Sequence, residues 1–357
     1  MVFLVLGAGV YQVTAPAAPA DAPGFSVGRL VQFAKGHFGG PRERRTVTRT
    51  ATLVPSAEIT SFDLRDFRGA VTISGSDRPD IAVRAEITLG GVDEAHLNDQ
   101  EAQLGLTLEG TGTTAALRFG FDHHATGRRP RYVVHVEVPS RFTVRLGGEG
   151  SAEVSLVAGL QLDGYAGDLR ADALTGPVTG RLRRGRAEFG PGAVLDLETE
   201  RGHLRAEKAE RVTLNSERTT LDLVDAAGPI TLEQDFCRIE IRGTGGPVHV
   251  TGEGGVIALR GVRHPLTIDA ERLTVNAELE APVVTAITVE NDDVEVTLPR
   301  DAGMQLQASV DEGGLVLPAG LTATTDGTRQ SVSGALAGGG PEVKLAVTRG
   351  DLRVRTR

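Results

Sequence analysis

Apolar and polar positions alternate in short triplets along most of the chain. Over residues 142–298, an apolar residue, a polar residue and a second apolar residue recur, as in Val212, Thr213 and Leu214. Between successive triplets the central residue advances by 8.8 residues on average. Alternation within a triplet is typical of a β-strand with one buried face, and the regular recurrence indicates a structural repeat.

Prolines mark one corner of this repeat. Pro229, Pro247, Pro265 and Pro282 each stand just before a triplet, and they lie 18, 18 and 17 residues apart. Proline fixes φ and cannot donate a ladder hydrogen bond, so it belongs at the start of a strand. Every second triplet therefore shares a corner, and one coil contains two triplets.

We therefore predict an all-β fold, a single-stranded parallel β-helix (β-solenoid) with coils of about 17–18 residues. The two apolar residues of each triplet would point inward, and coils stacked about 4.8 Å apart would pair their backbone groups along the axis. A right-handed winding is favoured, as in other parallel crossovers. In an antiparallel sandwich, strands also recur about every 8–12 residues. A sandwich, however, would not keep a proline at the same position of the repeat over four coils.

The pattern divides the chain into four predicted parts. Residues 1–24 contain an apolar run followed by Ala and Pro, which predicts a signal peptide or the end of a membrane anchor with its spacer, because the run is too short to span a bilayer. Residues 25–45 predict a linker or a short amphipathic helix, and residues 46–146 an N-terminal β region with loop insertions. Residues 147–357 predict the β-solenoid coils and a C-terminal cap, and we expect 46–357 to form one continuous domain.

Composition narrows the function classes. Gly accounts for 46 residues and aromatic residues for only 4 %, with no Trp, which suits tight turns and thin cores. The net charge of −9 argues against a nucleic-acid partner, which usually requires a basic face. The single cysteine, Cys237, leaves no intramolecular disulfide and no thiolate metal cluster. Gly7 and Gly9 resemble a dinucleotide-binding turn, but Pro16 and Pro19 forbid the helix that must follow, so no cofactor is expected.

The central residues of the triplets should form two outward rows, one on each strand class. One row comprises Arg170, Glu188, Arg205, Asp222 and Glu240, and the other comprises Thr179, Asp196, Thr213, Thr231, His249 and Thr267. The second row is a flat polar face that could bind an ordered glycan or another such protein, with Thr179, Thr213, Thr231, His249 and Thr267 as the ligand-facing candidates. Threonine also simply suits an exposed strand.

Two further clusters of charged residues suggest chemical roles. Asp222 and Glu240 should stack as neighbouring carboxylates, as the acid and base of a polysaccharide-acting enzyme would, although the adjacent Arg205 favours plain charge compensation. A basic patch could contact anionic wall polymer or lipid headgroups, or could only discourage stacking with another molecule. The patch is formed by Arg181, Arg183, Arg184 and Arg186.

No metal site is expected. Glu290, Asp292 and Asp293 could hold calcium, but the coils lack the repeated Asp-bearing nonapeptide of calcium-binding solenoids. His123 and His124 are adjacent in sequence, and adjacent residues rarely bind one metal together. We accordingly predict no catalytic, cofactor-binding or metal-binding residues.

Three blocks of the sequence resemble a known bacterial family. Residues 62–83 (FDLRDFRGAVTISGSDRPDIAV) are similar to the family's opening coil, and residues 132–139 (YVVHVEVP) resemble the strand and Pro that open its repeats. Residues 294–299 (VEVTLP), 302–317 and 343–354 look like its closing coils. The family is the bacterial "putative adhesin" family of β-strand-repeat proteins, domain of unknown function 4097.

This resemblance covers roughly residues 55–357 and implies a single-stranded β-solenoid that is exported or membrane-tethered and has no known catalytic residues. The family often has Ser-Gly-Asp at its corners, whereas residues 166–168 (AGD) keep only part of that motif and later corners use Gly-Pro. This departure weakens any analogy between the surface of this protein and the surfaces of family members.

We therefore expect a non-enzymatic protein of the extracytoplasmic cell envelope that acts as an adhesive, binding or scaffolding surface. Its expected partners are anionic wall polymer, a glycan or another envelope protein, with self-association possible, no nucleic acid, and membrane contact only through the N-terminal segment. One alternative is a polysaccharide-acting solenoid enzyme. Another is a self-assembling cytoplasmic scaffold of the bactofilin type. The long N-terminal β region argues against this alternative, because those compact scaffolds lack such a region.

Overall fold

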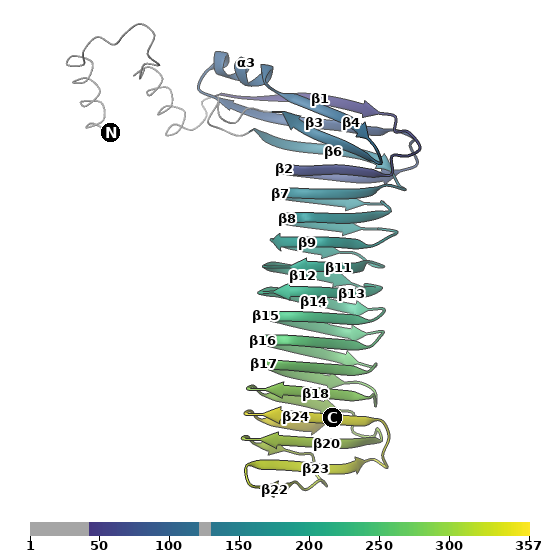
Figure 1. The fold of residues 1–357 in the computed structure, drawn as a ribbon, viewed down its shortest axis with the longest axis vertical. Coiled ribbons are helices and arrows are strands. Elements are labelled where there is room, and N and C mark those ends of the chain that lie inside the picture. Colours follow the sequence, from purple (N-terminus) through teal and green to yellow (C-terminus); the bar gives the residue numbers. More distant parts are fainter. Residues whose placement is uncertain (1–42, 121–129) are drawn as a thin grey trace, which may run out of the picture. The chain divides into compact units, whose positions relative to one another are not determined.

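The structure is a computed structural model that describes residues 43–120 and 130–357. The predicted signal-like segment 1–24, residues 25–42 of the predicted linker, and the pair His123 and His124 lie outside the described residues. The described part is all-β with a single helix, which confirms the all-β part of the prediction. Its strands all belong to one hydrogen-bonded sheet (Figure 1).

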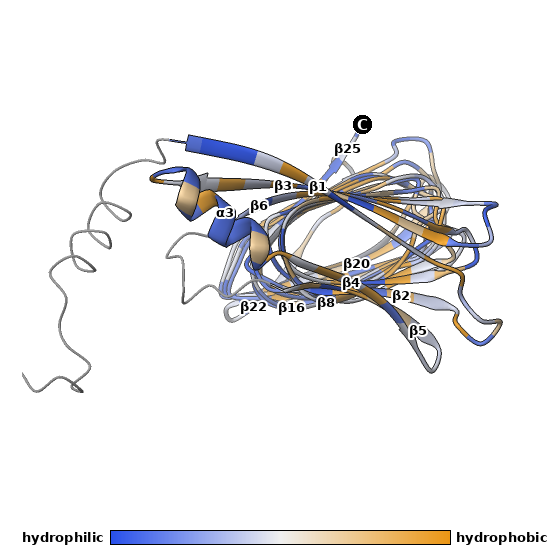
Figure 2. Ribbon diagram, turned by 90° about the horizontal axis from the view of Figure 1, so that it is seen from above, coloured by the Kyte–Doolittle hydropathy of each residue, from blue (hydrophilic) through white to orange (hydrophobic). Residues whose placement is uncertain are grey.

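The predicted β-helix fold class is wrong, because the sheet closes on itself into a parallel β-barrel. We expected corners to divide the chain into separate short strands on separate faces. In the structure, β15 (Ile230–Thr244) pairs with β16 (Val248–Val262) almost continuously from Ile230 to Arg242, straight through such a corner. Hydrogen bonding continues through that corner, and the end-on view shows the strands superimposed as a closed outline (Figure 2).

The chain forms two compact units that interleave in sequence. Among the described residues, the smaller unit contains 43–49, 85–106, 119–120 and 130–132, and the larger unit contains the remainder. The first six strands are β1 (Glu43–Leu53), β2 (Ser61–Ser76), β3 (Ile81–Gly91), β4 (Gly105–Thr111), β5 (Thr114–Gly120) and β6 (Arg131–Pro139).

The smaller unit contains the helix α3 (Glu94–Ala102). Asp93 caps its first turn by accepting a hydrogen bond from the His96 amide at 2.9 Å, which satisfies one of the free amides at the helix start. Arg45 of β1 donates to Asn98 and Glu101 on the helix at 2.7 and 3.0 Å. The single helix of the described residues is not long and apolar enough to cross a membrane.

Over residues 143–298 the larger unit is a stack of parallel strands whose partners lie 16 to 19 residues apart. Thr213 pairs with Thr231, and Asp222 pairs with Glu240. The stacked strands are β7 (Thr143–Ser155), β8 (Gly159–Asp172), β9 (Val178–Arg184), β10 (Arg186–Phe189), β11 (Val194–Thr199), β12 (Gly202–Glu207), β13 (Arg211–Glu217), β14 (Thr219–Ala226), β15, β16, β17 (Leu266–Leu279), β18 (Thr285–Glu290) and β19 (Val294–Leu298).

Three of the four marker prolines stand where the spacing predicts. Pro229, Pro247 and Pro265 directly precede β15, β16 and β17, and each proline carbonyl accepts the amide of the strand one step earlier at 2.9 to 3.0 Å. Pro282 departs from this pattern, because β18 begins three residues later and the Val284 carbonyl takes the equivalent hydrogen bond from Leu266.

The C-terminal strands end the stack with a change of direction. They are β20 (Met304–Asp311), β21 (Leu315–Val316), β22 (Thr324–Asp326), β23 (Arg329–Leu336), β24 (Glu342–Thr348) and β25 (Leu352–Thr356). The β23 strand runs antiparallel to β20 and to β22. The last edge strand, β22, is only three residues long and all three residues are exposed, and such a short edge is a poor template for pairing with another sheet.

The core consists of the inward-facing residues of the triplets. Leu223 and Ile241 are 0 % exposed and Leu259 is 1 % exposed, and the three lie on neighbouring strands. Stacked Leu, Ile and Val side chains of this kind lose their apolar surface to one another, which is the main stabilising contribution of such a core. Cys237 is also buried, and burial raises the pKa of its thiol, so it packs as a small apolar residue.

Candidate binding face and groove

The predicted threonine row is present in the structure as one continuous row of paired residues. We define the polar face as this row and the row beside it. The first row comprises Thr179, Asp196, Thr213, Thr231, His249 and Thr267, and the second comprises Arg181, Glu198, Asn215, Glu233, Thr251 and Asp269. Thr179 and Thr251 are half-buried and the other ten side chains are exposed.

Few side chains on the polar face are engaged with one another. Arg181 pairs with Glu198 at 2.5 Å, and Asn215 donates to Glu233 at 3.5 Å. No hydrogen bond or ion pair within the described residues engages the side chains of Thr213 and Thr231. These hydroxyls therefore face solvent and are available to a ligand.

The other predicted row, which contains Arg205, Asp222 and Glu240, forms a different surface, which we call the ion-pair face. Asp222 pairs with Arg205 at 3.3 Å and with Arg242 at 2.6 Å, and Glu240 pairs with Arg242 at 3.7 Å and Arg260 at 3.8 Å. The hydrogen bond that Arg242 donates to Asp222 raises the pKa of Arg242. Asp222 and Glu240 are neighbours as predicted. Their carboxylates are nonetheless shared among three arginines, so charge compensation accounts for them.

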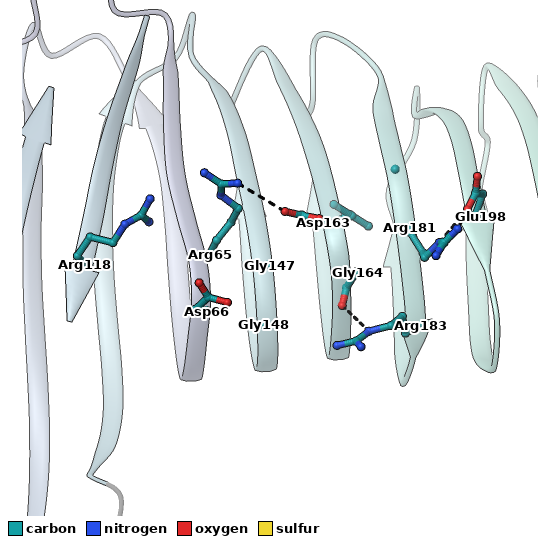
Figure 3. Close-up of a pocket in the computed structure, with 12 residues that line it drawn as sticks. Arg65, Asp66, Arg118, Gly147, Gly148, Asp163, Gly164, Arg181, Arg183 and Glu198 are labelled. Atoms are coloured by element: carbon teal, nitrogen blue, oxygen red, sulfur yellow. Dashed lines mark hydrogen bonds and ion pairs between the residues drawn. The ribbon is translucent and has the colours of Figure 1, made fainter. Parts of the chain in front are cut away.

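At the end of the polar face nearest β2, the sheet is hollowed into an open groove of about 870 Å³ (Figure 3). The groove lies where strand pairing shifts on successive strands. The β2–β7 pairing is irregular between Leu64 and Phe67, and the β7–β8 pairing is irregular between Gly147 and Glu149. Such bulges bend a strand and redirect its side chains, which explains why a regular sheet opens here.

Glycine keeps the floor of the groove free of side chains. Gly148 has φ +101 and Gly180 has φ +107, and a Cβ atom on either would lie 2.1 Å from the carbonyl oxygen of Phe67 or Leu162. Only glycine permits both the left-handed backbone and this close stacking. The backbone at the base of the groove is therefore accessible to a ligand.

Four arginines stand around this floor. They are Arg65 of β2, Arg118 of β5, and Arg181 and Arg183 of β9. Arg65 is held by Asp63, a carboxylate 2 % exposed, through contacts of 2.7 to 3.0 Å. This hydrogen bond raises the pKa of Arg65. Arg118 also pairs with Asp63, at 3.6 Å. A buried carboxylate requires such a partner, so Asp63 fixes the position of the Arg65 guanidinium.

The two remaining groove arginines, both on β9, differ in how they are engaged. Arg183 donates through Nε to the Gly164 carbonyl at 2.9 Å, and no carboxylate among the described residues pairs with it. Arg181 pairs with Glu198, and this hydrogen bond raises its pKa. Arg183 therefore has guanidinium nitrogens left for a ligand.

The structure divides the predicted basic patch. Arg181 and Arg183 line the groove, whereas Arg184 pairs with Glu149 at 2.9 Å and does not line it. Arg186 lies on the next strand, β10, where it pairs with His203 in the backbone ladder. The patch therefore supplies two residues to the groove.

Sequence reasoning missed Arg65 and Arg118, which lie outside the regular repeat. Two signals were present: the run Gly147, Gly148 and Gly150, and the break in alternation after Leu64. A cluster of glycines within a strand indicates bulges and close backbone approach. Nothing in the sequence, however, places β5 beside β2, a pairing that brings Arg118 to the groove.

The residues considered for calcium are already hydrogen-bonded. Asp292 accepts from the Thr274 hydroxyl at 2.9 Å and from the Asp293 amide at 2.7 Å, and Asp293 accepts from the Asp351 amide at 2.8 Å. Within residues 43–120 and 130–357, no group of three His, Cys, Asp or Glu residues is placed to hold a metal ion.

No family model and no curated protein matches this chain. Among solved structures, one that resembles it is "a putative cell adhesion protein" from Clostridium sporogenes, with 13 % identity and a TM-score of 0.21, covering 88 % of this chain and 100 % of that one. Another is a "putative adhesin" from Parabacteroides distasonis, with 11 % identity and a TM-score of 0.21, covering 87 % of this chain and 97 % of that one. At these values the likeness carries no argument about function.

Proposed function

We propose that this chain is a non-enzymatic binding protein of the cell envelope, whose polar face holds an extended ligand such as a wall polymer, a glycan or another envelope protein. The observation that supports this most is the alignment of exposed, mostly unengaged polar side chains on consecutive strands. Strands about 4.8 Å apart present hydrogen-bonding groups at a regular interval, which suits a ligand with its own repeat.

The alternative of a polysaccharide-acting enzyme has less support. Its acid and base would be Asp222 and Glu240, which are engaged with Arg205, Arg242 and Arg260 on the ion-pair face. A general acid needs a raised pKa and access to the substrate, and pairing with cations opposes protonation. We therefore place the function on the polar face.

The test is retention of cell-envelope polymer by the full-length protein immobilised on beads. We expect wild type to retain envelope polymer and Thr231→Arg to retain much less, because the longer side chain blocks the exposed row on β15. Thr220→Arg is the matched control, since Thr220 lies on β14 next to Arg238 and away from the polar face. Equal loss in both variants, or no retention by wild type, would contradict the proposal.

Exposure outside the cytoplasm is tested separately. We expect protease added to intact cells, or to cells with the outer barrier opened, to degrade the protein while a cytoplasmic marker survives. Protection until the cytoplasm is lysed would remove the envelope role, provided that the purified protein is itself cleaved.

A further inference from the structure

We infer that the glycine-floored groove binds an acidic polysaccharide, a glycan chain whose carboxylates are separated by hydroxyl-bearing sugar units. This inference rests on the proposed function, because the groove continues the polar face: Thr179 and Arg181 lie two residues apart on β9, and Arg181 lines the groove. It adds the chemical class of the ligand and the residues that select it.

The spacing of the arginines favours an extended ligand over a small anion. Arg65 lies on β2 and Arg183 on β9, and pairing runs from β2 to β7, from β7 to β8, and from β8 to β9. Three steps of about 4.8 Å separate the two ends by roughly 14 Å along the stack. A single phosphate or carboxylate cannot contact both ends, whereas a chain of several sugars can.

The charges around the groove indicate how the ligand's own charges are distributed. Carboxylates of Asp66, Asp163 and Glu198 stand among the four arginines. A polymer with a charge on every unit, such as polyphosphate, would meet repulsion at these carboxylates. In an acidic glycan, the carboxylates would take the arginines and the hydroxyls would donate to the protein carboxylates, so that both sets of groups are satisfied.

The backbone at the base of the groove adds a surface for hydroxyl groups. Gly147 and Gly164 contribute to the lining beside Gly148 and Gly180, so peptide groups rather than side chains form the base. A smaller hollow of about 350 Å³ adjoins the groove, shares Arg65 and Arg118 with it and adds Arg145. The hollow extends the same arginine-lined surface and lengthens the segment of glycan that can be held.

Arg183 is the residue whose removal tests the inference most cleanly. It is exposed, donates only to the Gly164 carbonyl, and pairs with no carboxylate within the described residues, so its replacement leaves no buried charge without a partner. Arg65 is unsuitable, because its loss would leave the buried Asp63 without its main partner. Arg211 of β13 is a matched control, an exposed arginine outside the groove.

The experiment is isothermal titration of the full-length protein with hyaluronan fragments, in which each uronate alternates with a neutral sugar, and with polygalacturonate. We expect hyaluronan to bind, and polygalacturonate, which has a carboxylate on every unit, to bind at least about tenfold more weakly, as should carboxyl-esterified hyaluronan and polyphosphate. The Arg183→Glu variant should bind hyaluronan about tenfold or more weakly, a loss of about 1.4 kcal/mol. Arg211→Glu should change affinity by less than about twofold, since it makes the same charge reversal outside the groove.

Three outcomes would overturn the inference: no binding of hyaluronan, equal loss of affinity in Arg183→Glu and Arg211→Glu, or tighter binding of polyphosphate or polygalacturonate than of hyaluronan. Arg183→Gln and thermal melting of each variant control for misfolding. Envelope retention that is sensitive to Thr231→Arg but accompanied by no uronate binding would leave the proposed function standing and remove the acidic glycan. Loss of both would remove both.

Discussion

The two outward faces of the larger unit share one backbone ladder but differ in how their charges are used. On the ion-pair face, Asp222 and Glu240 are shared by three arginines from neighbouring strands. On the polar face, Thr213 and Thr231 stand in equally good register with no side-chain partner within the described residues. The comparison shows that regular spacing does not make a binding surface. What distinguishes the two faces is whether the side chains are already satisfied by one another.

The largest expected effect comes from the interior that supports both faces. Leu223→Asp places a charge at a position that is 0 % exposed, where no cation can reach it. We expect a loss of several kcal/mol in the free energy of unfolding, measured by thermal or chemical denaturation. Thr231→Asp, which adds the same charge on the exposed side of β15 between Thr213 and His249, should change stability by less than about 0.5 kcal/mol. A wild-type melting temperature for Leu223→Asp would contradict its inward orientation.

An intermediate effect separates the two faces directly. Asp222→Ala should lower the free energy of unfolding by about 1 kcal/mol, since Arg205 and Arg242 lose a shared carboxylate but remain about half exposed to water. Ligand retention should not change, because Asp222 lies on the other face. Thr231→Arg should show the reverse, with stability nearly unchanged and retention lost. Retention that falls in Asp222→Ala would mean that the ion-pair face takes part in binding.

The smallest effect concerns an exposed ion pair at a corner between the faces. Arg263 donates to Glu280 at 2.6 Å, and this hydrogen bond lowers the pKa of that carboxyl. A carboxyl with a lowered folded pKa contributes stability above its unfolded pKa and loses it as pH falls through the folded value. From about pH 4.3 downward, wild type should therefore lose slightly more stability than Arg263→Gln. An NMR titration in which the Glu280 pKa is the same in both proteins would contradict this assignment.

The sequence predicted the strands and their register well because both depend on local pattern. Alternation decides which residues of a triplet face the core, and corner prolines fix the offset between partners at Pro229, Pro247 and Pro265. The proline spacing was misleading at Pro282, where extra residues shift the start of β18 without changing the apolar pattern. The sequence-based prediction was also wrong about the fold class. Turn-forming residues indicate where a corner lies, but they do not indicate whether hydrogen bonding continues through it, as it does in β15.

The groove also separates what the sequence could predict from what it could not. Sequence reasoning selected Arg181 and Arg183 because they stand in a conspicuous run of arginines, yet the same run includes Arg184 and Arg186, which serve elsewhere. Which members of a charge cluster share a site depends on the direction of each side chain, and bulges alter that direction locally.

By itself, the sequence determined the all-β character, the inward and outward residues of each triplet and the two outward rows, because a period of two and a fixed repeat length leave little freedom. Only the tertiary structure decided that the sheet closes, that Arg242 and Arg260 join Arg205 in pairing with Asp222 and Glu240, and that Arg65, Arg118 and Arg183 surround one groove. These depend on contacts between residues 17 to more than 100 positions apart in the chain, which no local pattern encodes.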